Sequence, residues 1–454
     1  MADQKVSQLA ELAAGDLDPA ADFLLVSDMS ASASKRMKAS EMIRASLPYI
    51  STFWDFTTGS LLPTVSFTRA STGWRTNSSG VLVPETTDVA RFEYDPVTLA
   101  PRGLLIEAAA TNGIRNSTMQ GAVAGTPGTL PTNWSFNSTG GLTQSVVGVG
   151  TINGIPYIDY RYQGTSTDAG GSNQYLETTT QIVAALSQNW TVSAYVALVA
   201  GSLSGGVTMK LGAVQRTSAG GAAAGGGGSS NLDGSAFSPT ATLTRYSAPV
   251  SLNSSDVAYI QPKFSFVYTS GAAIDFTLRI GLPQMVQASM VSSPIPTAGT
   301  AASRAADVVL ITNPQALADQ CYIVKARTPV LSSSTTNTAF QVDDGTFNNR
   351  RTIYYFNGRM YARALVGGVT QATLDLGAVA NDTDFVIAAR FADNNFAASL
   401  NGGAIVTDTS GANPLGLTTA RIGALGSSNP WNSTIRSLET RRTATDAELP
   451  LLAA

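Results

Sequence analysis

The sequence predicts a mainly β protein in which a small N-terminal module is followed by two antiparallel jelly-roll β-sandwiches. Apolar and polar residues alternate with a period of two over residues 191–198 and 274–280, as they do in half-buried strands. Turn-forming residues separate such segments. Charged residues make up only 13% of the 454 residues, against about 25% in typical domains, and small uncharged residues replace them. A chain this long is expected to form more than one domain.

Residues 1–50 are predicted to form a small N-terminal module. Residues 23–26 are typical of a strand, residues 35–38 of a return strand, and residues 40–45 of a short helix. A unit of this size is too small for a core of its own, so we expect it to be stable only when docked or trimerised. The alternative is a hairpin that caps the first large domain.

Residues 51–113, which we call the strap, connect this module to the rest of the chain. Gly, Pro, Asn and Asp crowd residues 67–112 and leave only short apolar pieces between turns. Such a segment holds one conformation only if it lies against something larger. We expect Trp54 and Trp74 to hold the strap in place.

The first large β domain is predicted at residues 114–304. Asn153 and Gly154 lie between two β-like runs, which is the strongest short sequence signal for a hairpin. Spaced strands with intervening turns favour an antiparallel sandwich. Trp190 begins an alternating strand and is expected in the core.

The second large β domain is predicted at residues 305–454. Residues 353–376 read as a three-stranded meander with turns at Asn-Gly and Gly-Gly. Near the end of the chain, Thr445 followed by Glu448 predicts the capping box of a short terminal helix.

Composition excludes several classes of function. The chain has no histidine, which removes the Ser-His-Asp triad and histidine-ligated metals. Its net charge of -3 gives no basic face for nucleic acid. The single cysteine, Cys321, excludes an intramolecular disulfide, and we expect a buried thiol in a strand.

The sequence also predicts no membrane insertion and no secretion. No apolar run reaches the roughly 18 residues that a membrane-spanning helix needs. The N-terminus lacks the basic and apolar regions of a signal peptide. Synthesis in a cytoplasm is therefore expected.

Several separated motifs in the strap share their order with a known module. Phe67-Thr-Arg-Ala-Ser71 is followed by Arg91-Phe-x-Tyr-Asp-Pro96, by Gly103-Leu-Leu-Ile-Glu107 and by Thr111-Asn112. In this order they closely resemble a module of tailed-bacteriophage virion proteins of the head spike or tail fibre type. The segment Ser303-Arg-Ala-Ala-Asp307 resembles the tether of the same module. The two β domains resemble carbohydrate-binding modules and concanavalin-like or laminin-G-like jelly rolls, respectively.

This resemblance implies a role and partners. Residues 1–50 would anchor the chain to the capsid, portal or tail of a virion synthesised in a bacterial host, and the chain would form a homotrimer at the virion surface. The distal sandwiches would bind host surface glycans. The candidate anchor residues are Leu9, Leu12, Phe23, Leu25, Lys35, Arg36 and Met37.

Aromatic residues in turns are the candidates for glycan binding, because a flat ring packs against a sugar and polar neighbours orient it. Trp431 and Asn429 lie in a predicted loop, and Tyr354, Tyr355 and Arg359 flank one hairpin. Alternate residues of that hairpin must point to opposite faces. For Trp431, packing over the end of the sandwich is the competing interpretation.

Carboxylates offer two further interpretations, a glycosidase pair and a structural calcium site. A glycosidase needs two carboxyls about 5 to 9.5 Å apart, and Ca²⁺ prefers oxygen ligands. The candidates are Asp343, Asp344, Asn348, Asn349, Asp382, Asp384, Asp393, Asn394 and Asn395. All lie in predicted turns, where Asp and Asn bond locally to the backbone, so we predict no catalytic residue, no cofactor and no dedicated metal site.

Together these observations predict a binding protein and not an enzyme. The expected function is a virion appendage that attaches to glycans. A depolymerase spike that cleaves capsular polysaccharide, and a purely structural decoration protein, remain as alternatives.

Overall fold

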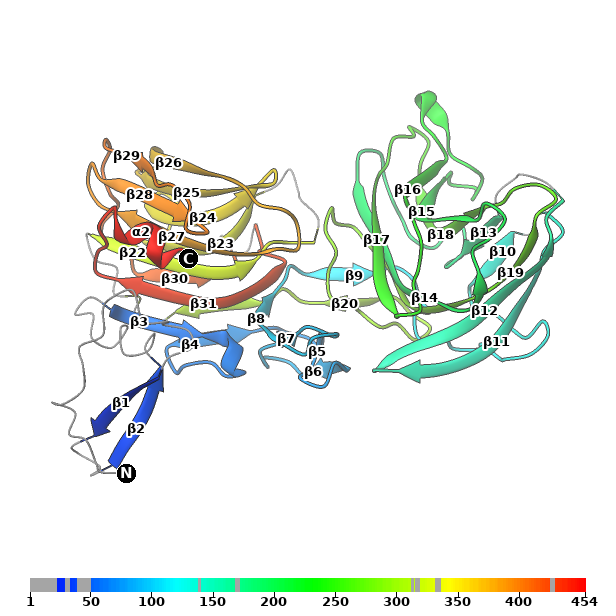
Figure 1. Cartoon of the computed structure of the whole chain (residues 1–454). Coiled ribbons are helices and arrows are strands. Elements are labelled where there is room, and N and C mark those ends of the chain that lie inside the picture. Colours follow the sequence, from blue (N-terminus) through cyan, green and yellow to red (C-terminus); the bar gives the residue numbers. More distant parts are fainter. Residues whose placement is uncertain are drawn as a thin grey trace.

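The computed structural model describes residues 23–28, 33–38, 50–137, 140–167, 172–311, 314, 319–330, 336–424 and 429–454. Nearly every regular element in these ranges is a β-strand, and all strand pairs are antiparallel (Figure 1). The mainly β class predicted from periodicity is therefore confirmed.

The N-terminal hairpin contains β1 (Phe23–Asp28) and β2 (Ala33–Lys38), with Leu25 opposite Arg36. The strand and return strand predicted from the sequence are confirmed. The predicted helix at residues 40–45 and the anchor candidates Leu9 and Leu12 lie outside the described residues. The same holds for the side chains of the other anchor candidates, which are Phe23, Leu25, Lys35, Arg36 and Met37.

The central sandwich, residues 113–301, contains two five-stranded sheets that pack around one core. The first sheet has the order β10 (Ser135–Asn137), β13 (Ser172–Tyr175), β18 (Tyr259–Val267), β15 (Thr208–Arg216) and β16 (Asn231–Phe237). The second has the order β11 (Thr143–Ile152), β12 (Ile155–Thr165), β19 (Ala273–Val286), β14 (Asn189–Ser202) and β17 (Thr244–Ser251).

Local sequence signals account for much of the central sandwich. Asn153 and Gly154 form the turn between β11 and β12 with φ angles of 49° and 76°, the left-handed geometry that favours this dipeptide. Val192 and Val196 of β14 are fully buried, and Trp190 is in the core. The hairpin and the burial of Trp190 are both confirmed.

The C-terminal sandwich consists of a seven-stranded and an eight-stranded sheet. The seven-stranded sheet has the order β26 (Val369–Ala378), β25 (Arg359–Val366), β24 (Arg350–Phe356), β23 (Asn337–Asp343), β30 (Thr419–Ile422), β21 (Val308–Ile311) and β4 (Val65–Thr68). The eight-stranded sheet contains β29 (Val406–Asp408), β28 (Phe396–Leu400), β27 (Asp384–Phe391), β22 (Gln320–Arg327), β31 (Ser433–Arg441), β8 (Pro101–Ile106), β7 (Phe92–Tyr94) and β3 (Ile50–Asp55). The predicted meander is confirmed as β24, β25 and β26.

The strap supplies strands to both sheets of the C-terminal sandwich. Its β4 pairs with β21, and its β3 and β8 pair with β31. The strap side chains in the core are Trp54, Phe56, Val65, Phe67, Leu104 and Ile106. Gly103 in β8 has a φ of +99°, and a Cβ there would lie 2.3 Å from the carbonyl oxygen of Ile435. Only glycine permits this close pairing.

The central sandwich is therefore inserted between strands of the C-terminal sandwich (Figure 1). The chain leaves the C-terminal sandwich through β9 (Ala110–Asn112) and returns through β20 (Ala302–Arg304), and these two strands pair with each other. A further strap hairpin, β5 (Gly73–Thr76) with β6 (Leu82–Glu85), lies at this junction. Its Leu82 N–H donates to the carbonyl oxygen of Asn153 at 2.9 Å.

Short helical elements complete the described chain. They are η2 (Phe56–Thr58), η3 (Gly225–Gly227) and α2 (Glu448–Leu452). Within the described ranges, no helix has the length and apolarity to cross a membrane.

The helix α2 packs on the outer face of the eight-stranded sheet, against a cluster that includes Cys321. Thr445 donates from its N–H and its hydroxyl to the Glu448 carboxylate at 2.6 and 2.9 Å, which is one half of the predicted capping box. Cys321 is buried in β22 as predicted, and burial raises the pKa of its thiol to about 12.

Candidate functional site

Trp431, the main glycan candidate from the sequence, lies in the core of the C-terminal sandwich. Its side chain is fully buried, 5.8 Å from the ring of Phe385 between centroids, and its indole N–H donates to the carbonyl oxygen of Thr434 at 3.3 Å. The glycan-binding interpretation of this ring is therefore corrected, and the competing interpretation, packing over the end of the sandwich, is confirmed. The indole of Trp431 is not available to a sugar.

The two hairpin tyrosines point to opposite faces of β24. Tyr355 is buried in the core and its hydroxyl donates to Asn381 Oδ1 at 2.9 Å. Tyr354 lies on the outer face, but Tyr361 stacks on it at 5.1 Å and the Arg363 guanidinium lies 4.9 Å from its ring centre. Only 7% of Tyr354 is exposed, so its ring offers little surface to a ligand.

The other two glycan candidates are Arg359 and Asn429. Arg359 is exposed and pairs with Asp375 at 2.9 Å. Asn429 is half-buried in a loop with a φ of 51°, and its carbonyl oxygen accepts the Thr338 N–H. The structure does not bring the five sequence candidates together into one site.

The candidate carboxylates form local turn and ion-pair contacts. Asp344 accepts hydrogen bonds from Thr346 and Asn349, and the buried Asp343 contacts Gln341, Gly345 and Arg421. In the part of the chain that the structure describes, no group of three or more acidic or cysteine side chains is placed to hold a metal ion.

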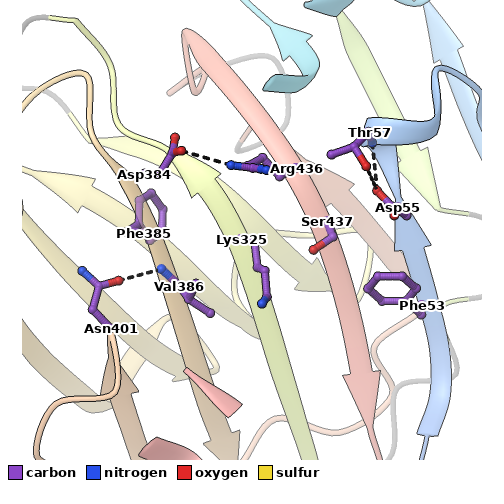
Figure 2. A pocket seen from close by; sticks show the side chains of 10 residues that line it. All are labelled: Phe53, Asp55, Thr57, Lys325, Asp384, Phe385, Val386, Asn401, Arg436 and Ser437. Carbon is purple, nitrogen blue, oxygen red and sulfur yellow. Dashed lines mark hydrogen bonds and ion pairs between the residues drawn. The ribbon is translucent and has the colours of Figure 1, made fainter. Parts of the chain in front are cut away.

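An open groove of about 430 Å³ lies on the outer face of the eight-stranded sheet. Its residues come from β3, η2, β22, β27 and β31 and from the turn after β28. Figure 2 shows Lys325 at its centre, between Phe53 and Ser437 on one side and Val386 and Asn401 on the other. We call it the sheet groove.

Strand periodicity explains why these side chains point outward. Trp54 of β3, Val324 of β22 and Phe385 of β27 face the core, so their neighbours Phe53, Lys325 and Asp384 face the groove. At one end, Val386 packs against the cluster beneath α2. The terminal helix therefore covers part of this sheet face and leaves the groove open beside it.

Ion pairs hold the other end of the sheet groove. Asp384 binds Arg436 at 3.1 Å and Arg327 at 2.9 Å, and Arg327 also binds Asp382 at 2.6 Å. The Asn401 side-chain oxygen accepts the Val386 N–H at 2.8 Å, which orients the amide (Figure 2). A ring, an ammonium group, an amide and carboxylates thus lie on one rigid surface, the kinds of groups that orient a sugar.

Sequence reasoning missed this groove. The one available signal was the alternation of Phe53 with the core residues Trp54 and Phe56, which places Phe53 on the opposite face of its strand. The pairing of β3 with β31, which brings Phe53 near Ser437, joins residues almost 400 positions apart in the sequence, and no local pattern predicts it.

A second feature is a group of buried charges at the domain junction, and its members all belong to the strap and tether motifs named from the sequence. Arg69 contacts Asp307 at 3.3 Å, Arg91 contacts Glu107 at 2.7 Å and Asp307 at 2.5 Å, and Arg304 pairs with Glu107. All five residues are at most 4% exposed. We call them the junction network.

Ser293, between β19 and β20, ties the central sandwich to this network. Its hydroxyl donates to Glu107 at 2.6 Å and accepts from Arg91 and Arg304, each at 2.8 Å. Burial alone would raise the pKa of Glu107, but Arg304, Arg91 and the bonds from Ser293 outweigh burial and lower it to about 2. The carboxylate is therefore charged at neutral pH and holds the guanidinium groups together.

Comparisons with known proteins identify no family. No protein-family model matches the sequence, and no curated protein matches it. One similar solved structure is the CBM40 of the Ruminococcus gnavus IT-sialidase bound to α2,3-sialyllactose. It aligns over 31% of this chain and 85% of its own, with 18% identity and a TM-score of 0.27.

Two other solved structures align over more of the chain. Domains LG4-5 of the mouse laminin α1 chain cover 61% of this chain and 89% of their own, with 8% identity and a TM-score of 0.21. A truncated AlyQ with CBM32 and alginate lyase domains covers 64% and 86%, with 9% identity and a TM-score of 0.17. Because these TM-scores are low, we assign the two sandwiches from the strand order of this chain alone and not from the similar structures. None of the three is a virion protein.

Proposed function

We propose that this chain is an adhesive virion protein of a tailed bacteriophage, a head fibre or spike or a tail fibre, that binds host surface glycans. The sheet groove is the observation that carries the glycan part of the proposal. It combines an outward Phe53 ring with Lys325 and Asn401 on a rigid sheet. The work of the chain is then binding, not catalysis.

The virion part of the proposal rests on the strap motifs. The charged residues of those motifs, Arg69, Arg91 and Glu107, meet Arg304 and Asp307 of the tether in the junction network. A network of this kind supports a stiff two-domain arm, which suits a protein that presents a surface away from a particle. Residues 1–50 would dock to the particle, and three copies would assemble, so that weak sugar sites gain avidity.

Glycan binding is tested with the purified full chain on an array of bacterial surface polysaccharides. We expect Phe53→Ala and Lys325→Ala each to weaken binding about tenfold, the typical effect of losing one stacking or charged contact. Arg161→Ala, which removes an exposed cation of the central sandwich, serves as the matched variant and is expected to bind as the wild type does. If all four proteins bind equally well, the sheet groove is not the glycan-binding site.

The virion role is tested on particles of the phage that encodes the chain. Cryo-electron microscopy of intact particles, with a tag at the C-terminus, is expected to show the chain at the surface and its first fifty residues in contact with another virion protein. A chain lacking residues 1–50 is expected to be missing from purified particles. Wild-type particles that lack the chain would contradict this role.

A further inference from the structure

A second concave site lies between the two sandwiches, apart from the sheet groove. Two adjoining cavities of about 560 and 160 Å³ share the residues Thr76, Leu82, Glu93, Arg102, Tyr195 and Arg245 among their linings. These residues come from the strap and from strands β14 and β17 of the central sandwich, and Val330 and Asp382 of the C-terminal sandwich complete the wall. We call this site the interdomain cleft. Clefts between domains are common ligand sites.

Two charged residues of the cleft have no ion-pair partner among the described residues. Arg75, Arg102 and Arg327 pair with Glu85, Asp95 and Asp382, and Glu107 belongs to the junction network. Arg245 has only neutral partners, since it donates to the Ser292 carbonyl at 2.6 Å and to the Ser193 hydroxyl at 2.9 Å. Glu93 accepts the Thr76 N–H at 3.0 Å.

Arg245 is a half-buried cation that forms no direct ion pair within the described residues, and Glu93 and Glu107 act on it only from a longer distance. Its Nε, inaccessible to solvent, has no hydrogen-bond partner among the described residues. The guanidinium lies 5.7 Å from the ring centre of Tyr195, which orients it but does not neutralise it. An anion entering the cleft would therefore gain more from Arg245 than from the paired arginines.

The rest of the cleft suits a ring-shaped ligand with an apolar face. Leu82, Ile155 and Leu282 form a small buried cluster, and Tyr195 and Leu243 pack against it. Asn153 and Thr242 add polar groups at the rim. An apolar wall beside polar edges is the lining that carbohydrate ligands require.

Glu93 is placed to donate a hydrogen bond to such a ligand. Burial raises the pKa of its carboxyl to about 7, and the bonds from Thr76 and the charge of Arg91 offset burial only in part. The charged and titratable groups around it are Arg75, Arg91, Arg102, Glu107, Tyr195, Arg245, Arg327 and Asp382. Below about pH 7 Glu93 is mostly neutral, so it can donate a hydrogen bond and does not repel an anionic ligand.

We propose that the interdomain cleft binds a saccharide that carries a carboxylate, with Arg245 as its counter-ion and Glu93 as a hydrogen-bond donor. The inference rests on the proposed glycan-binding function but names a different site and a narrower ligand class. The position of the cleft means that such a ligand touches both sandwiches at once.

The test uses isothermal titration of the full chain with a galacturonic acid trisaccharide and with its methyl ester, which has the same ring but no charge. At about pH 6 we expect the acid to bind about tenfold more tightly than the ester, the effect of one charge-assisted hydrogen bond. Arg245→Gln is expected to remove this difference. Raising the pH to about 8 is expected to weaken binding of the acid to the wild type, because Glu93 becomes an anion.

Glu93→Gln keeps the shape of Glu93 without its titration, so it is expected to bind the acid equally at both pH values. If Arg245→Gln does not fold, the inference is still tested by the comparison of acid with ester on the wild type and by the pH dependence of Glu93→Gln. Equal affinity for acid and ester, or the same pH dependence in Glu93→Gln as in the wild type, would overturn the inference. Arg161→Ala removes an exposed cation that lies outside both the cleft and the sheet groove, and it is expected to bind the acid as the wild type does. The sheet groove is tested separately by Phe53→Ala and Lys325→Ala on the polysaccharide array, so failure here is distinguishable from failure of the proposed function.

Discussion

The two sandwiches of this protein are built from the chain in different ways. The central sandwich uses one continuous stretch, and its ten strands pair only with one another. The C-terminal sandwich joins residues 308–454 to strands of the strap that lie before the insertion (Figure 1). The first domain is thus defined by its own sequence, whereas the second is complete only when two distant segments meet.

This difference shows where the molecule depends on long-range contacts. The strap contributes core residues such as Trp54 and Leu104, and the junction network buries charges from both segments. A buried charge that loses its partner is costly, so the network strongly favours the one arrangement that satisfies all its members. The same arrangement creates the interdomain cleft.

The largest expected effect comes from separating the two domains. Residues 113–301 alone are expected to unfold cooperatively, whereas residues 305–454 alone are not, because they lack the strap strands and the apolar side chains that those strands bury. Near-ultraviolet circular dichroism during thermal unfolding measures both. Joining residues 50–109 to residues 305–454 through a short Gly/Ser linker is expected to restore cooperative unfolding. Cooperative unfolding of 305–454 alone would show that the strap is dispensable.

A smaller loss is expected from Asp307→Ala. This change leaves Arg69 and Arg91 without their shared carboxylate in a buried site, which lowers the free energy of unfolding by about 3–5 kcal/mol. Urea denaturation of the full chain measures it, and the transition of the C-terminal sandwich is expected to move. As a control, Asp275→Ala in the exposed pair with Arg161 is expected to leave stability unchanged. Equal effects of the two changes would contradict the role of the network.

The smallest expected effect is a loss of stability in acid. The folded pKa of Glu107, about 2, lies below the usual value of 4.5, so its contribution is fully present above about pH 4.5 and is lost as the pH falls toward 2. At about pH 3 the loss is on the order of 1–2 kcal/mol. Glu107→Gln is expected to be less stable at neutral pH and to show a shallower decline in acid. A wild-type C-terminal transition that does not move between these pH values would exclude this contribution.

Several parts of the fold were predictable because their signals are local. The Asn153–Gly154 turn, the alternating strand after Trp190 and the meander of β24 to β26 each depend on neighbours within a few residues. For Trp431 the sequence left two interpretations open, because a loop rich in Asn and Pro has no period that shows whether its Trp faces the core or the solvent. Its burial depends on Phe385 and Thr434.

The sheet groove and the interdomain cleft were also beyond local signals. Phe53 and Lys325 share a groove only because β3 and β22 both pair with β31, and Glu93 and Arg245 share a cleft only because the strap hairpin packs on the central sandwich. Short strands such as β4 carry too few residues to specify a partner more than 200 positions away.

The amino-acid sequence was sufficient to predict the β class, several of the strands and turns, and the absence of histidine chemistry, because composition and period-two alternation act residue by residue. The folded structure was needed to show that one sandwich is inserted in the other, which motif charges meet, and where the groove and the cleft lie. Those features depend on residues far apart in the chain. Such residues come together because this buries their apolar side chains in one core and pairs their buried charges.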